Sequence, residues 1–298
     1  MAETLHEMTV GLHDADGGNF PNYALMKISA YHKAQGDSVE WWMPIKTYDR
    51  VYSSKIFTFT PENMYLPQNT IKGGTGYGIY DELPHVIDDV FPDYSIYPKC
   101  DYAIGFITRG CIRKCTWCVV PRKEGTIRAY RTWQEIKRPD SNKIVLMDNN
   151  ILACEYGKTQ LESMIGENVK IDCNQGLDAR LIDDDVARIL SKLQWIRFIR
   201  MSCDTDEMLE TVIRTIERLG KFGVKAYRIF VYLLVTDVKS AENRAIALRK
   251  AGVDVFAQPY RDCENRAEPT IEQKAFARYV NRKEIFKSIE TFAEYKRK

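Results

Sequence analysis

Long apolar runs are absent from this sequence of 298 residues. None approaches the ~18–20 residues that a helix needs to cross a bilayer, so no membrane partner is expected. The N-terminal segment lacks the basic and apolar stretches of a secretory signal, and we expect a cytoplasmic protein. A net charge of +2 is too small to favour an anionic partner by itself.

Cysteine and histidine are both scarce. Eight cysteines in 298 residues are too few for a disulfide-stabilised scaffold, and they indicate a reducing compartment instead. None of the four histidines lies within 25 residues of Cys111, Cys115 or Cys118. A zinc site built from Cys and His pairs is therefore disfavoured at these three cysteines.

The most informative segment is Cys111-Ile-Arg-Lys-Cys115-Thr-Trp-Cys118, a Cys-x3-Cys-x2-Cys spacing. Three thiolates can hold three irons of a [4Fe–4S] cube and leave the fourth iron open to a ligand. A ferredoxin-type cluster or a structural zinc site needs a fourth ligand, and the nearest preceding cysteine is Cys100, eleven residues earlier. The spacing favours a site-differentiated cluster, with zinc or unligated thiols as alternatives.

This motif, with Trp117 directly before its third cysteine, resembles the signature of radical S-adenosylmethionine (SAM) enzymes. The string from Thr108 to Gly125 is similar to the branch that contains tRNA methylthiotransferases and radical SAM proteins with a cobalamin-binding domain. The resemblance implies an enzyme in which Cys111, Cys115 and Cys118 hold a [4Fe–4S] cluster. One electron from an external flavodoxin- or ferredoxin-type donor would then cleave SAM into methionine and a 5′-deoxyadenosyl radical, which acts on an unknown substrate.

The resemblance also implies which residues contact SAM. Trp117 stands where the family packs a side chain by the adenine ring. Ser202 stands where a polar residue meets the ribose or the carboxylate. The remaining candidates follow the second and third predicted strands: Asp148, Asn149, Asn174 and Arg180. The family's Gly-Gly-Glu-like segment is replaced by Asp148-Asn149-Asn150.

From residue 99 to residue 298, apolar strand-like runs alternate with amphipathic helical stretches six times. This alternation predicts a parallel α/β fold, and the resemblance implies a six-unit partial (β/α) barrel with a helical C-terminal tail. Helix starts are expected at Asp183–Asp185, Thr205 and Ser240. The predicted strands are Tyr102–Thr108, Lys143–Asp148, Val169–Asn174, Ile196–Ser202, Arg228–Val235 and Val253–Gln258.

The cysteine motif follows the first of these strands, at the sheet edge where active sites of parallel α/β folds gather. Several strands carry polar residues on one face, such as Asp172 and Asn174 on the third and Arg200 and Ser202 on the fourth. We interpret this polar face as the wall of a ligand-filled interior. Satisfied buried polar groups are the alternative.

Residues 1–98 are predicted to form a small Rossmann-like α/β domain. The expected elements are strands Thr9–Leu12, Ser38–Trp42 and Lys55–Thr58, a helix from Pro21 to Gly36, and a flexible loop Lys72–Gly78. The domain resembles a cobalamin-binding domain. The family's cobalt-ligating His is replaced by Asp16, which favours a packing or substrate-gating domain over cobalamin binding.

Three other functions remain open. A methylthiotransferase-like or methyltransferase activity on tRNA or other RNA is the first, although the three further N-terminal cysteines of methylthiotransferases are missing. The second is a nucleic-acid-binding protein with a structural cluster or zinc, and the third an electron-transfer protein. Basic residues around the motif allow a small-molecule, anionic or nucleic-acid substrate: Arg109, Arg113, Lys114, Arg122, Lys123, Arg128 and Arg131.

Four cysteines outside the motif fall near predicted strand ends: Cys154, Cys173, Cys203 and Cys263. No two of them have a metal-ligand spacing. We interpret them as small buried hydrophobic residues rather than as a second cluster.

Overall fold

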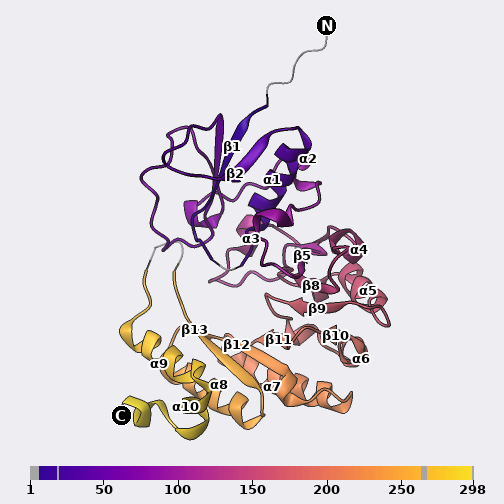
Figure 1. Cartoon of the computed structure of the whole chain (residues 1–298). Helices are drawn as coiled ribbons and strands as arrows, with labels where there is room; N and C mark the ends of the chain where they lie inside the picture. Colours follow the sequence, from indigo (N-terminus) through magenta and orange to yellow (C-terminus); the bar gives the residue numbers. More distant parts are fainter. Residues whose placement is uncertain (1–6, 19, 263–266, 297–298) are drawn as a thin grey trace. The chain divides into compact units, whose positions relative to one another are not determined.

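A computed structural model describes residues 7–18, 20–262 and 267–296 of the chain. These residues divide into two compact units, one up to Asp101 and one from Tyr102 onward. Each unit has its own hydrophobic core, and Figure 1 shows the helices and strands of both units. Both units are mixed α/β structures built on parallel sheets.

The N-terminal unit is built on a four-stranded parallel sheet in the order β2-β1-β3-β4. Helix α1 begins where the side chain of Asn22 accepts a hydrogen bond from the backbone of Leu25. It buries Leu25, Met26 and Ile28. The elements of this unit are β1 (Thr9–Asp14), α1 (Tyr23–Ala34), β2 (Ser38–Trp41), β3 (Arg50–Ser54), β4 (Ile71–Gly73), η1 (Thr75–Tyr77), α2 (His85–Asp88) and η2 (Tyr94–Ile96).

Two predictions for this unit were wrong. The strand expected at Lys55–Thr58 lies earlier, at β3, because Val51, Tyr52 and two serines are buried there beside β1. The loop expected to be flexible at Lys72–Gly78 forms the edge strand β4 and the 3₁₀ helix η1. The sheet recruits this segment through backbone hydrogen bonds, which do not depend on side-chain type.

The C-terminal unit contains two parallel sheets and a short antiparallel ribbon. One sheet has the order β10-β9-β8-β5, and the other β11-β12-β13. The strands are β5 (Ala103–Gly105), β6 (Thr108–Arg109), β7 (Arg128–Ala129), β8 (Lys143–Leu146), β9 (Lys170–Cys173), β10 (Gln194–Trp195), β11 (Ile199–Ser202), β12 (Ile229–Val235) and β13 (Asp254–Pro259).

A parallel bridge between Leu177 and Met201 joins the segment after β9 to β11. The six strands that the sequence predicted therefore lie side by side in the same order as in the chain, from β5 to β13. Across the described residues they form no closed barrel.

Helices alternate with these strands. Buried side chains such as Val231 and Leu233 on β12 and Leu248 on α8 belong to one core. Asp183 is the N-cap of α6 and Thr205 is the N-cap of α7, as expected. The helices are α3 (Val120–Lys123), α4 (Trp133–Ile136), α5 (Glu155–Ser163), α6 (Asp184–Lys192), α7 (Asp206–Lys221), α8 (Val238–Lys250), α9 (Ile271–Asn281), α10 (Lys283–Ser288) and α11 (Phe292–Lys296), with 3₁₀ helices η3 (Ile151–Ala153), η4 (Ala179–Leu181) and η5 (Ala226–Arg228).

The predicted cap of α8 was wrong. Its N-cap is Asp237, whose carboxylate accepts the hydrogen bond of the Ser240 backbone N–H at 2.8 Å. Aspartate and serine are nearly equivalent as N-caps, so local sequence did not separate them. No helix in the part of the chain that the structure describes has both the length and the apolar character of a bilayer span.

Candidate functional site

The cysteine motif lies in a loop that a two-stranded antiparallel ribbon closes. Thr108 and Arg109 of β6 pair with Ala129 and Arg128 of β7, respectively. Inside the ribbon, the Cys111 backbone N–H donates to the carbonyl of Gly125 at 3.2 Å. Gly110 has a φ of +84°, and a side chain there would collide with the backbone carbonyl of Thr126. The residue before the first cysteine must therefore be glycine.

Asp148 holds the base of this loop from the end of β8. Its carboxylate accepts hydrogen bonds from the backbone N–H groups of Ile107 and Thr108 and from Thr108 Oγ1, the last at 2.7 Å. The side chain is buried, and its burial raises its pKa to about 6. The sequence predicts a SAM contact for Asp148; in the structure its carboxylate contacts the base of the cysteine loop.

Glu124 holds the other side of the loop. It accepts hydrogen bonds from the Gly110 backbone N–H at 2.9 Å and from Asn149 Nδ2 at 2.8 Å. Asn149 therefore also has a partner inside the protein. The predicted contact of Asp148 and Asn149 with SAM stays a prediction. In the structure, the hydrogen bonds of both side chains hold the cysteine loop in position.

The three cysteines differ in exposure. Cys111 and Cys115 are half-buried and Cys118 is exposed. Burial raises the pKa of the Cys115 thiol, while the nearby Arg180 guanidinium acts in the opposite direction. Partial desolvation of its sulfur raises the pKa of Cys118, and the charges of Cys115 and Cys111 add to the effect. The three thiols are thus close enough to interact electrostatically.

In the described ranges, no three His, Cys, Asp or Glu side chains are arranged to hold a single metal ion. Coordination by the three thiols therefore stays a prediction. The donor set itself suits an iron–sulfur cluster, because Cys111 Sγ already accepts two N–H groups. Hydrogen bonds of this kind are typical of cluster sulfurs.

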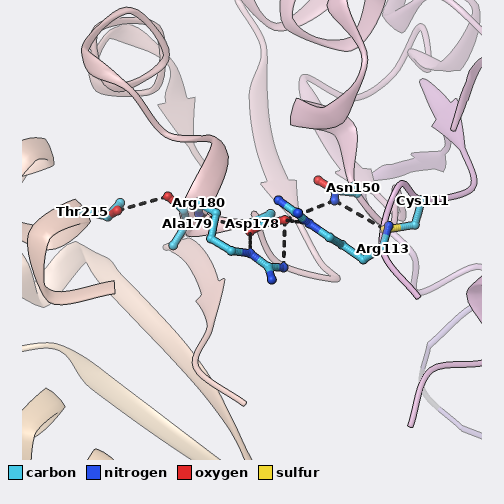
Figure 2. Close-up of polar contacts among 7 residues, drawn as sticks. All are labelled: Cys111, Arg113, Asn150, Asp178, Ala179, Arg180 and Thr215. Atoms are coloured by element: carbon cyan, nitrogen blue, oxygen red, sulfur yellow. Dashed lines mark hydrogen bonds and ion pairs between the residues drawn. The ribbon is translucent and has the colours of Figure 1, made fainter. Parts of the chain in front are cut away.

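Those two donors are the backbone N–H of Arg113, at 3.3 Å, and Asn150 Nδ2, at 3.4 Å. Figure 2 shows Asn150 between Cys111 and Asp178, whose Oδ2 lies 3.5 Å from the same Nδ2. Asn150 is 3% exposed, and its Oδ1 is a buried acceptor without a hydrogen-bond partner. Our sequence prediction left this residue out, although it stands beside Asp148 and Asn149.

Asp178 joins two arginines beside the cysteine loop (Figure 2). Arg113 Nε lies 2.9 Å from Asp178 Oδ2, and Arg180 reaches both carboxylate oxygens at 2.7 and 3.0 Å. Burial by itself would raise the pKa of Asp178, but the hydrogen bonds from Arg180 and Arg113 outweigh it and the pKa is lowered. We call Arg113, Asp178 and Arg180 the arginine cluster.

The segment after β9 places Arg180 close to the cysteines. Leu177 N donates to the Arg200 carbonyl of β11, and Thr215 of α7 donates to the carbonyl of Ala179 (Figure 2). These bonds fix the segment between two elements. The structure therefore brings Arg180 close to Cys111 and Cys115. From the sequence, these residues were expected only to follow different strands of the same sheet.

Ser202 at the end of β11 lies beside the carboxylate of Asp204. Burial raises the pKa of Asp204, and the positive charge of Arg180 acts against this rise. Ser202 and Arg180 thus both lie near Asp204. Trp117 is half-buried within the cysteine loop.

Asn174 takes part in the polar face through its backbone. Its carbonyl accepts a hydrogen bond from the hydroxyl of Tyr232 at 3.2 Å. Arg200 donates to Tyr232 as well and pairs with both oxygens of Asp172, at 2.6 and 2.7 Å. Phe230 of β12 stacks on Phe256 of β13 and on Phe198, which directly precedes β11. The polar face is therefore internally hydrogen-bonded, and aromatic rings lie beside its polar groups.

Much of the basic charge around the motif is engaged within the protein. Arg109 Nη2 lies 3.4 Å from Glu124 Oε1, and Arg113 pairs with Asp178. Arg128 donates to the Glu124 carbonyl at 2.8 Å. Burial lowers the pKa of Lys123. These contacts leave less of the charge available for a polyanion.

Two of the four cysteines that were predicted near strand ends are core residues. Cys173 and Cys203 are buried in the main hydrophobic core, and burial raises the pKa of Cys203 to about 12. Cys154 is half-buried at the N-cap of α5. Cys263 lies outside the described residues.

Comparison of the chain with known protein families finds no matching family model, and comparison with curated proteins finds no matching sequence.

Proposed function

We propose that the chain is a radical SAM enzyme that uses Cys111, Cys115 and Cys118 to hold a [4Fe–4S] cluster. The observation that supports this most strongly is the environment of Cys111. Its sulfur accepts two N–H groups, from Arg113 and Asn150, in a loop that buried hydrogen bonds of Asp148 and Glu124 keep in place. Such a prearranged site is what a cluster with an open iron requires.

When bound, the cluster would supply one electron to SAM, which would in turn supply a 5′-deoxyadenosyl radical. The chain's own residues have simpler tasks. Arg180 places a positive charge beside the Cys115 and Cys111 thiols, which lowers the electrostatic cost of collecting negative charge there, and Arg113 pairs with the same Asp178 as Arg180. Arg180 is also a suitable partner for the SAM carboxylate, because guanidinium and carboxylate can bond through two N–H groups.

Within this proposal, the six parallel strands from β5 to β13 form a partial (β/α) barrel. The proposal includes an external flavodoxin- or ferredoxin-type electron donor. The polar and aromatic face of β11, β12 and β13 would line the space for the substrate.

For the N-terminal unit we propose no cobalamin chemistry. Asp16, which stands in place of the family's His, has a different task here. Its carboxylate accepts hydrogen bonds from the Ile56 backbone and Thr60 Oγ1, both at 2.6 Å. It therefore holds the chain after β3.

Anaerobic reconstitution with iron and sulfide tests the proposed function. We expect a [4Fe–4S] spectrum that changes when SAM is added, and release of 5′-deoxyadenosine after reduction with dithionite. Cys115→Ala should lose cluster loading and Cys154→Ala should keep it. Stoichiometric binding of zinc without iron would contradict the proposal. So would a cluster whose spectrum does not change when SAM is added and that does not cleave SAM.

A further inference from the structure

The N-terminal unit contains a cavity of about 440 Å³ that the proposed function does not use. It lies at the carboxyl end of β1, where its lining includes Leu12, His13 and Asp14. All of its lining residues belong to this unit. Its volume falls within the range of ~300–1,000 Å³ that is usual for small-molecule sites.

The topology of the sheet favours a ligand at this place. Strand β1 lies between β2 and β3. After β1 the chain forms β2 on one side of it and then crosses over to form β3 on the other side. Open parallel sheets bind ligands at the carboxyl end of the strand where the order reverses. The cavity occupies that end of β1.

Two tryptophans supply aromatic walls, and both are held in place. Trp42 lies edge-on to His13, with ring centres 5.8 Å apart. A side chain at Gly11 would come within 3.2 Å of Trp42, so the glycine makes room for the indole. Trp41 lies edge-on to Tyr97 at 5.3 Å and is still 38% exposed. A rigid aromatic surface is thus open to a flat ring.

Polar groups lie at two other parts of the lining. The Tyr97 hydroxyl donates to Asp14 Oδ2 at 2.8 Å, and burial raises the pKa of Tyr97, which keeps it a donor. Each carboxylate oxygen of Asp14 can accept a further hydrogen bond. Lys99 and the backbone of Gly17 and Gly18 also line the cavity, the glycines in the turn that leads from β1 to α1. Glycine turns at this position let a phosphate approach the backbone closely.

We propose that this cavity binds a nucleoside 5′-phosphate. The base packs against Trp41 and Trp42, the ribose hydroxyls donate to Asp14, and the phosphate meets Lys99 and the glycine turn. The proposal is independent of the cysteine loop and of any cluster.

Isothermal titration with adenosine, guanosine, cytidine and uridine 5′-monophosphates tests it. The full-length protein carries Cys111→Ser, Cys115→Ser and Cys118→Ser, so that no cluster can contribute. We expect saturable binding of at least one probe with one site per chain. Trp41→Leu should weaken that probe about 5- to 150-fold, the usual effect of losing one stacked base. Tyr65→Leu removes an aromatic side chain that is 81% exposed and outside the lining, and it should leave binding unchanged.

Asp14→Asn provides a second, conservative test. It should weaken the bound ribonucleotide about tenfold, because a charged acceptor is lost. The matching 2′,3′-dideoxynucleotide lacks both hydroxyls. It should therefore bind the protein with Asp14 and the Asp14→Asn variant with equal affinity. Absence of saturation with all four probes would overturn the proposal, as would wild-type affinity in Trp41→Leu. These outcomes leave the reconstitution experiment on the cysteine loop unaffected.

Discussion

Two of the carboxylates around the cysteine loop, Asp148 at its base and Asp178 beside it, have opposite electrostatic surroundings. Asp148 at the base accepts only neutral donors, from Ile107 and Thr108, and its pKa is raised to about 6 because of burial. Asp178 at the side meets two guanidinium groups, and its pKa is lowered. The base is therefore organised by steric fit and hydrogen bonds, whereas the arginine cluster is organised by charge.

The largest expected effect is steric, at the base. Gly110→Ala puts a Cβ on a residue with left-handed backbone conformation, and this Cβ would clash with the Thr126 carbonyl. We expect about 4 kcal/mol of lost unfolding free energy, from backbone strain plus overpacking. Gly125→Ala is the control, because Gly125 also has a positive φ but open space around its Cα. It should cost about 1 kcal/mol in urea unfolding; equal losses would remove the steric argument.

Removal of the base carboxylate comes next. Asp148→Ala leaves the donors of Ile107 and Thr108 buried without an acceptor. One such group typically costs 1–3 kcal/mol, and we expect a total of about 3 kcal/mol by urea unfolding. Iron loading after reconstitution should fall with it. A variant with unchanged stability would mean that water or another group replaces the carboxylate.

The opposite pKa shifts predict opposite dependences on pH. The folded pKa of Asp148 lies above its ordinary value of 3.8, so its contribution to stability is present below pH 4 and is lost as the pH rises toward 6. A shift of about two pH units corresponds to about 3 kcal/mol. The free energy of unfolding in urea should be measured for the wild type and for Asp148→Asn between pH 4 and 7. The difference between the two should show this loss as the pH rises.

Asp178 should behave in reverse. Its lowered folded pKa means that its contribution is present above pH 4 and is lost as the pH falls through the folded pKa. Asp178→Asn should cost about 1 kcal/mol at pH 7, because both arginine partners are partly exposed. The difference from wild type should shrink in acid. A difference that grows in acid would contradict the ion-pair interpretation.

The smallest effect concerns Asn150, which touches Cys111 and Asp178 at once. Asn150→Leu removes one N–H donor to the Cys111 sulfur, so we expect the reconstituted cluster to load but to have a more negative reduction potential. Potentiometric titration followed by electron paramagnetic resonance measures this. Asn149→Leu, which breaks a contact with Glu124 instead, is the control and should leave the potential close to that of the wild type.

Local sequence determined most of the fold of the C-terminal unit. Apolar runs such as Arg228–Val235 and acid-rich helix starts such as Asp183–Asp185 predicted β12 and α6, since burial periodicity and capping are local properties. Strand β3 was misplaced because its serines look polar, yet the sheet buries them. Strand β4 was missed since only backbone pairing with β3 defines it.

For the site, the sequence by itself determined the cysteine spacing and the sheet edge on which it lies. Only the tertiary structure decided which polar residues face that loop. It turned Asp148 toward the loop backbone and Asn149 toward the Glu124 carboxylate, and it brought Asn150, Asp178 and Arg180 to the thiols. The reason is physical: spacing along a strand sets the side of the sheet, but partners from different strands are chosen by packing and by the need to pair buried charges.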